Sequence, residues 1–104
     1  MKEHFSFDQR LGILLPEFAL EWDQYNKQTQ QEILLYWEQI RGSIPDRMAE
    51  LENIINQKQA QLSNESNFPR SCILNNEIAE LASIINDLWI WYRTNQTISA
   101  KVHQ

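Results

Sequence analysis

Two separate stretches of this chain carry the same hydrophobic spacing, and this match constrains the fold more than any other feature. In both stretches apolar residues recur at alternating intervals of four and three, the heptad pattern of helices that pack side by side. One lysine interrupts the first series. The two series are Ile44, Met48, Leu51, Ile55, Lys58, Leu62 and Leu74, Ile78, Leu81, Ile85, Leu88, Tyr92. The spacing predicts two long helices, over about 44–62 and 70–93.

The stretch between the two predicted helices, residues 63–69, is rich in turn-forming residues. A connection this short makes consecutive helices antiparallel neighbours. We therefore expect a helical hairpin in which Leu62 faces Leu74 and Ile44 faces Tyr92.

Lys58 is the polar residue on this predicted seam. One interpretation is a buried cation that binds an anion or a carboxylate. The other is structural: the aliphatic stem packs on Ile78 while the amine reaches water or Glu77. A polar seam residue also fixes helix register and partner number. We favour the structural interpretation.

The N-terminal part of the chain predicts further helices. Its apolar residues follow a helical period, which predicts a helix over about 6–25. Pro16 lies inside this stretch, so the helix is either kinked or divided there. A second helix is expected over about 29–41, ended by Gly42, and Pro45 suits the first turn of the helix that follows.

Bulky apolar residues also flank the seam of the predicted hairpin, namely Ile54, Ile84, Trp91, Ala82 and Trp89. A two-helix coiled coil would leave them in water, so we expect the N-terminal helices to cover them. The predicted fold class is all-α, a three- to four-helix bundle built on the antiparallel hairpin. The same stripe would also serve as a homodimer interface, and the two interpretations are compatible.

The length of the chain fits one domain over residues 1–104, with 1–5 and 95–104 expected to be frayed tails. Two Gly and three Pro are too few for the many tight turns of a β-sandwich or barrel.

Charge and composition exclude several classes of partner. The net charge is −5, and residues 1–52 carry ten acidic and five basic side chains. An acidic chain without a basic stripe is a poor ligand for nucleic acid or for an anionic membrane surface. No apolar run has the length of a membrane span or a signal-peptide core, so we expect a cytoplasmic protein. Its size and style favour a bacterial origin.

Few residues suggest catalysis or metal binding. His4 and His103 lie in the two predicted tails, and Cys72 is the single cysteine, so no metal site is expected. No phosphate-binding or nucleophile motif is present, and we expect no cofactor and no enzymatic activity. Cys72 begins a predicted helix beside Arg70, an environment that lowers a thiol pKa. It is either a reactive thiol or, as we favour, a small buried residue.

The end of the last predicted helix combines aromatic residues with arginine, the composition of interface hot spots. Tryptophan also fills the cores of small bundles, so interface and core are both open. The candidate contact residues are Trp89, Ile90, Trp91 and Arg93, followed by Trp22 and Trp37, with Lys58 on the seam. These residues predict a regulatory or adaptor protein that binds another protein and forms a homodimer. The acidic N-terminal half is expected to steer it towards a basic surface on its partner.

Residues 77–92 resemble the second helix of the small aspartyl-phosphate phosphatases of spore-forming bacteria. That family forms antiparallel helical hairpins and acts on response regulators, with the signature Ser-Gln-x-Leu-Asp followed by Leu and, later, Tyr. The residues in that register here are Ala82-Ser83-Ile84-Ile85-Asn86. Alanine replaces the serine and asparagine replaces the acid. The resemblance, over less than half of the chain, implies a regulator without the catalytic acid, in which Asn86, Ser83 and Lys58 are the residues to test.

Overall fold

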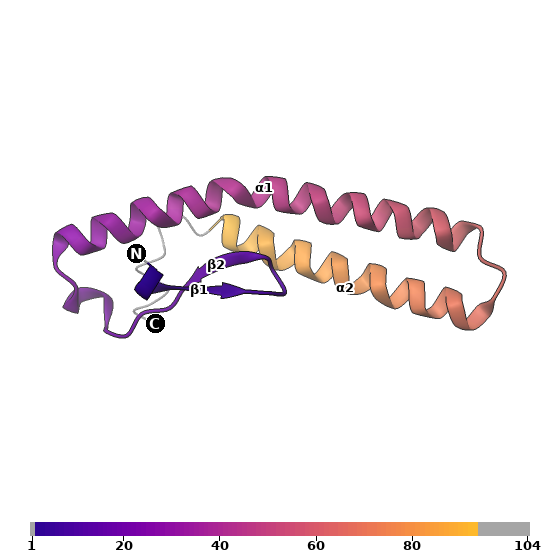
Figure 1. The fold of residues 1–104 in the computed structure, drawn as a ribbon, viewed down its shortest axis with the longest axis horizontal. Helices are drawn as coiled ribbons and strands as arrows, with labels where there is room; N and C mark the ends of the chain where they lie inside the picture. Colours follow the sequence, from indigo (N-terminus) through magenta and orange to yellow (C-terminus); the bar gives the residue numbers. More distant parts are fainter. Residues whose placement is uncertain (1, 94–104) are drawn as a thin grey trace.

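The computed structural model describes residues 2–93, in which two long helices pack against each other as a hairpin (Figure 1). Helix α1 spans Lys27–Ser63 and α2 spans Phe68–Tyr92. Before them come a short 3-10 helix η1 (Lys2–His4), strands β1 (Phe5–Asp8) and β2 (Ile13–Pro16), and a second 3-10 turn η2 (Trp22–Gln24). The molecule is elongated, at 60 × 21 × 20 Å.

Asparagine side chains begin both long helices. The Asn26 side chain accepts a hydrogen bond from the Thr29 N–H at 2.8 Å, and Asn67 does the same for Arg70 at 3.0 Å. Such caps satisfy backbone donors that a helix leaves without a partner in its first turn. Helix α2 therefore begins at Phe68, two residues earlier than the spacing predicted, and the connection shortens to residues 64–67.

The predicted break at Gly42 and Pro45 is absent, and residues 29–62 belong to one continuous helix. Pro45 removes one backbone donor, which costs about 3 kcal/mol inside a helix. The buried face runs through this point without interruption, however, along Ile33, Trp37, Ile40, Ile44, Met48 and Leu51. Burying such large side chains contributes about 1.5–3 kcal/mol for each one. The continuous apolar face therefore outweighs the local cost of the proline.

The helix predicted over 6–25 is wrong: β1 and β2 form an antiparallel hairpin in its place. The turn explains why. Gly12 has a φ of +77°, a conformation that side-chain-bearing residues rarely adopt. The Asp8 side chain accepts from the Leu11 N–H at 2.8 Å, and the Asp8 carbonyl accepts from the Gly12 N–H at 2.7 Å. These local bonds stabilise a tight turn. A helix through residues 8–12 could form only if they were broken.

The β-hairpin covers one part of the helical hairpin, at the end far from the α1–α2 connection (Figure 1). We call this part the covered half: residues 2–51 and 82–92. Its core joins Phe5, Leu11 and Ile13 to residues of both helices, among them Trp37 and Leu88, which are fully buried. Residues 2–5, expected to be frayed, lie here in η1 and β1. The frayed tail predicted over 95–104 lies outside the described residues.

The remaining part, residues 52–81, is the loop half, in which the two helices pack mainly on each other; the β-hairpin reaches its edge through Arg10, which donates to Glu80. Leu74 is the one buried apolar side chain within these residues. The Lys58 Nζ donates to Glu77 Oε1 at 3.1 Å, which agrees with the predicted register at this level. The structure thus confirms the long hairpin, whereas the described residues form two long helices and a small sheet in place of a three- to four-helix bundle.

Candidate protein-interaction surface

The aromatic cluster near the end of α2 divides between the core and the surface. Trp91 faces inward and packs edge-to-face on Trp37, with ring centroids 5.6 Å apart. Trp89 is 47% exposed and Ile90 is 42% exposed. The sequence left core and interface open for this cluster; the structure places Trp91 against the core and Trp89 at the surface.

Neighbouring side chains hold Trp89 in place. Its ring packs edge-to-face on Tyr92, with centroids 5.7 Å apart, and the Arg41 guanidinium lies 4.8 Å from the centre of the Tyr92 ring. Arg41 also donates to the Glu38 carboxylate at 2.7 Å and to the Tyr92 carbonyl at 3.0 Å. The bond to Glu38 raises the pKa of Arg41 above its usual value. An aromatic ring ordered before binding loses little entropy when a partner covers it.

Trp89 lies on the side of α2 that faces away from the β-hairpin. Asp87, two residues earlier, bonds to the hairpin turn through Arg10. Two residues along an α-helix point about 160° apart around its axis. Leu88, between them, is fully buried. The side of the helical hairpin that carries Trp89 is therefore opposite the side that the β-hairpin covers.

The other candidate tryptophans belong to the core. Trp37 is fully buried and Trp22 is 7% exposed, packed beside Phe18. The Gln30 side chain donates to the Trp22 and Tyr25 carbonyls and so fastens η2 to α1. In this arrangement Trp22 and Trp37 are inaccessible to a partner. Arg93, at the C-terminal end of α2, is exposed.

Lys58 is half-buried, and its amine forms an ion pair with Glu77 across the hairpin. This is the structural interpretation drawn from the sequence: the stem lies in the seam and the cation has a carboxylate partner. A shallow hollow beside the pair is lined by Lys58, Glu77, Glu80 and Leu81.

The three polar residues suggested by the phosphatase resemblance do not gather in one place. Ser83 accepts a hydrogen bond from Arg10 at 2.9 Å. Asn86 is exposed on another part of α2. Lys58 lies at the level of Glu77, which is nine residues and about 13 Å along α2 from Asn86. Nothing here forms a shared polar pocket.

Arg10, at the tip of the β-hairpin, donates to three side chains of α2, and the sequence did not predict these contacts. Its guanidinium donates to Glu80 at 3.1 Å, Ser83 at 2.9 Å and Asp87 at 2.7 Å, three residues on successive turns of α2. These bonds raise the pKa of Arg10, the one to Asp87 most strongly. The spacing of the three α2 residues places them on one polar face of the helix, which the sequence shows. It does not show that Arg10 is their partner.

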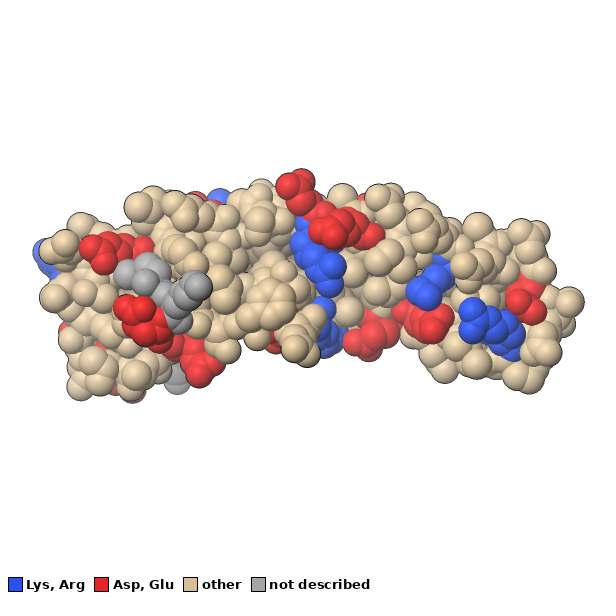
Figure 2. Space-filling view, in the orientation of Figure 1, with Lys and Arg blue, Asp and Glu red and all other residues tan. Residues whose placement is uncertain are grey.

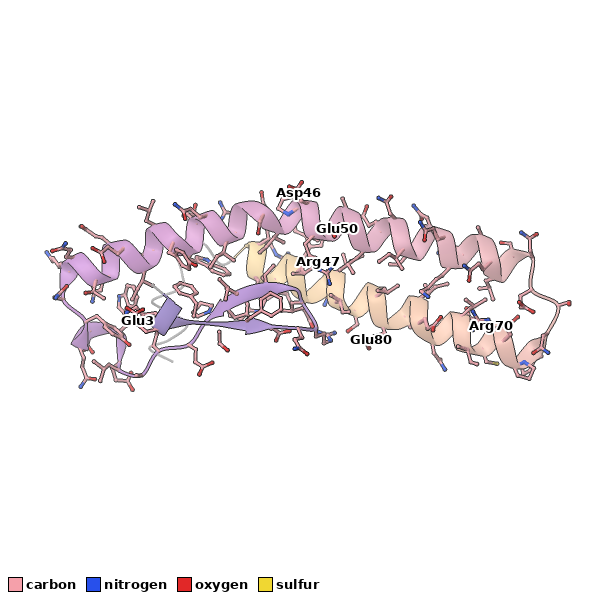
Figure 3. All side chains as sticks on the ribbon, viewed as in Figure 1. Glu3, Asp46, Arg47, Glu50, Arg70 and Glu80 are labelled. Atoms are coloured by element: carbon pink, nitrogen blue, oxygen red, sulfur yellow. The ribbon has the colours of Figure 1, made fainter. Side chains whose placement is uncertain are left out.

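A second arginine secures the same turn from α1. Arg47 Nε donates to the Leu11 carbonyl at 2.9 Å, and its guanidinium lies over Gly12. Figure 3 shows Arg47 and Glu80 on either side of the hairpin tip. In Figure 2 the basic side chains form a short band across the middle of this face, with acidic side chains beside it. This band fastens the β-hairpin to both helices.

Cys72 is exposed near the start of α2, where a buried position was favoured. No group of three metal-ligating side chains occurs within residues 2–93. No helix in the same part of the chain is long and apolar enough to cross a bilayer. The sequence matches no family model, and no curated protein or solved structure is significantly similar to it.

Proposed function

We propose that this protein is a cytoplasmic regulatory or adaptor protein that acts through protein–protein interaction. Its contact surface is formed by Trp89, Ile90 and Arg93, which we call the Trp89 surface. The observation that carries the proposal is the exposure of Trp89 and Ile90 while Trp22 and Trp37 are buried. Exposed, pre-ordered tryptophan beside arginine is the usual centre of an interface hot spot.

The first partner in this proposal is a second copy of the chain. Each copy supplies two long helices, and the β-hairpin covers the side opposite Trp89. A two-fold axis along the Trp89 side would join two helical hairpins into a four-helix bundle, using the same patch on both copies. The helix bundle expected from the sequence would then form between copies.

The chain's charge bears on any further partner. A net charge of −5 repels acidic surfaces and speeds association with basic ones. A further partner is therefore expected to present a basic surface to this chain.

Light scattering over a dilution series tests the proposal. The expected mass is twice 12.4 kDa at high concentration, falling to the monomer on dilution. Trp89→Ser should weaken the dimer by about 30-fold or more, because truncating a hot-spot tryptophan costs about 2 kcal/mol or more.

Phe68→Ser is the matched control, since Phe68 is 77% exposed at the opposite end of α2. It should leave the dissociation constant unchanged. A wild-type monomer at every concentration would overturn self-association. A dimer that Phe68→Ser dissociates and Trp89→Ser does not would place the contact elsewhere.

A further inference from the structure

Helix α2 carries a second apolar stripe on the side that faces away from the β-hairpin. An α-helix turns about 100° per residue, so the residues four, seven and eleven positions before Trp89 lie within about 40° of it around the helix axis. These residues are Ile85, Ala82 and Ile78. Ala82 is exposed, whereas Ile78 and Ile85 are half-buried. Together with Trp89 they form what we call the α2 stripe, with apolar residues at intervals of four, three and four.

The stripe stays at the surface because the β-hairpin packs on the opposite side of α2 and shifts the buried face of the helix towards itself. The heptad series placed Ile85 in the seam with α1, yet Ile84 is the buried residue, at 8% exposure, beside the fully buried Leu88. Ile78 and Ile85 therefore retain apolar surface that a further helix can cover.

The α2 stripe contains no acidic residue. Helix α2 has three, and all of them lie on its other sides. Glu80 and Asp87 bond to Arg10 of the β-hairpin, and Glu77 bonds to Lys58 of α1. A second copy carries the same net charge of −5, so close approach is least unfavourable where neither surface presents a carboxylate. The charge pattern therefore favours the α2 stripe as the contact with a second copy.

Helix α1 offers a different surface on the same side of the molecule. Arg41 reaches the Tyr92 carbonyl there and also bonds to Glu38. Glu52 follows Arg41 by eleven residues, which returns it to the same side of the helix. Packing the α2 stripe of one copy on α1 of another would cover the Glu52 carboxylate, and burying a charge without a new partner is costly. The α2 stripe of a second copy is the better match.

We infer, building on the proposed self-association through Trp89, that the two copies of α2 pack antiparallel along this stripe. A two-fold axis between Ala82 and Ile85 places Ala82 opposite Ile85 of the partner subunit. The same axis places Trp89 opposite Ile78 of the partner subunit. The small Ala82 side chain beside the axis lets the two helices approach closely. The four-helix bundle is then centred on the two copies of α2.

Disulfide formation in a Cys72→Ser background tests the antiparallel register. Ala82→Cys should link two copies, because the two residues 82 lie only three residues, about 4.5 Å, apart along the helix direction. Asn75→Cys, at an exposed position on the same side of α2, is the matched control. Its two copies lie seventeen residues, about 25 Å, apart in this register and should stay reduced. Linking of both variants would indicate parallel helices and contradict the inference.

Charge exchange at Ala82 tests the same contact in solution. Ala82→Glu and Ala82→Lys should each raise the dissociation constant of the dimer about 10-fold or more, because like charges then meet beside the axis. An equimolar mixture of the two should recover a dimer, whereas the same exchange at Asn75 should show no such recovery.

The outcomes separate this inference from the proposed function. A wild-type dimer in which Ala82→Cys forms no disulfide and the charge exchange has no effect would overturn the α2 register and leave self-association standing. A wild-type monomer at every concentration would overturn both.

Discussion

The covered half and the loop half of the helical hairpin share the same two helices but differ in what packs on them. In the covered half the β-hairpin adds a third layer, and Trp37, Ile44 and Leu88 are fully buried. In the loop half Leu74 alone is fully buried, and the other apolar side chains of the two helices remain at least partly exposed to solvent. Heptad spacing is sufficient to build a hairpin, but a dry core requires the additional layer.

The largest expected effect is on the core of the covered half. Trp37→Ala should lower the free energy of unfolding by about 3–5 kcal/mol, because it removes a fully buried ring of α1 that packs on Trp91 of α2. Leu62→Ala, at a half-buried seam position of the loop half, should cost about 1 kcal/mol. Urea denaturation of both variants measures the contrast. Equal losses would show that the two halves are equally well packed.

The second prediction sets the two glycines against each other. Gly12→Ala places a methyl group 2.6 Å from Arg47 Nε at a φ of +77°. It should destabilise the protein by about 1–2 kcal/mol. Gly42→Ala meets nothing within 4 Å in the middle of α1 and should stabilise the protein by about 0.5–1 kcal/mol.

Thermal melting of the two alanine variants, followed by circular dichroism, checks these opposite signs. A Gly12→Ala protein as stable as the wild type would mean that the hairpin turn is not fastened beneath Arg47. A destabilised Gly42→Ala protein would contradict the uninterrupted course of α1.

The smallest effect concerns the link between β-hairpin and α2. Arg10→Gln removes the cation that joins Glu80 and Asp87, so the amides of β1 and β2 should exchange faster while those of residues 68–79 keep their rates. The difference in β1 and β2 amide exchange between the wild type and Arg10→Gln should decrease in high salt, because these ion pairs are exposed to solvent. Faster exchange throughout α2 would show that the link supports the whole hairpin.

The sign of the pH dependence follows from the raised pKa of Arg10. A cation whose pKa is higher in the folded state stabilises that state below its unfolded pKa and loses this effect as pH rises through its folded pKa. For an arginine both values are strongly alkaline, so its contribution should stay constant from neutral to mildly alkaline pH. Denaturation midpoints of the wild type and of Arg10→Gln should therefore differ by the same amount across that range.

The sequence predicted the parts of the fold that depend on local periodicity. The two heptad series predicted the hairpin, and the position of Lys58 in them placed its amine towards water or Glu77; in the structure it bonds Glu77. The break at Gly42 and Pro45 was wrong because local helix signals were weighed without the continuous buried face. The N-terminal helix was wrong because a chance helical period masked two four-residue strands, whose turn depends on Asp8.

The candidate surface was predictable in composition but not in detail. Residues 88–93 stood out as aromatic and basic, yet spacing alone does not decide which tryptophan faces Trp37. That choice depends on where the β-hairpin packs, and this in turn depends on Arg10 and its three partners on α2. Contacts between residues seventy or more positions apart leave no periodic signal in a single sequence.

The most direct test of the Trp89 surface uses the four tryptophans as separate probes. Their indole N–H signals can be assigned in a two-dimensional NMR spectrum and followed as the protein is diluted. The Trp89 signal should shift or broaden with concentration, while the signals of the buried Trp22 and Trp37 stay in place. A Trp89 signal unaffected by concentration while the protein dimerises would contradict the proposed surface.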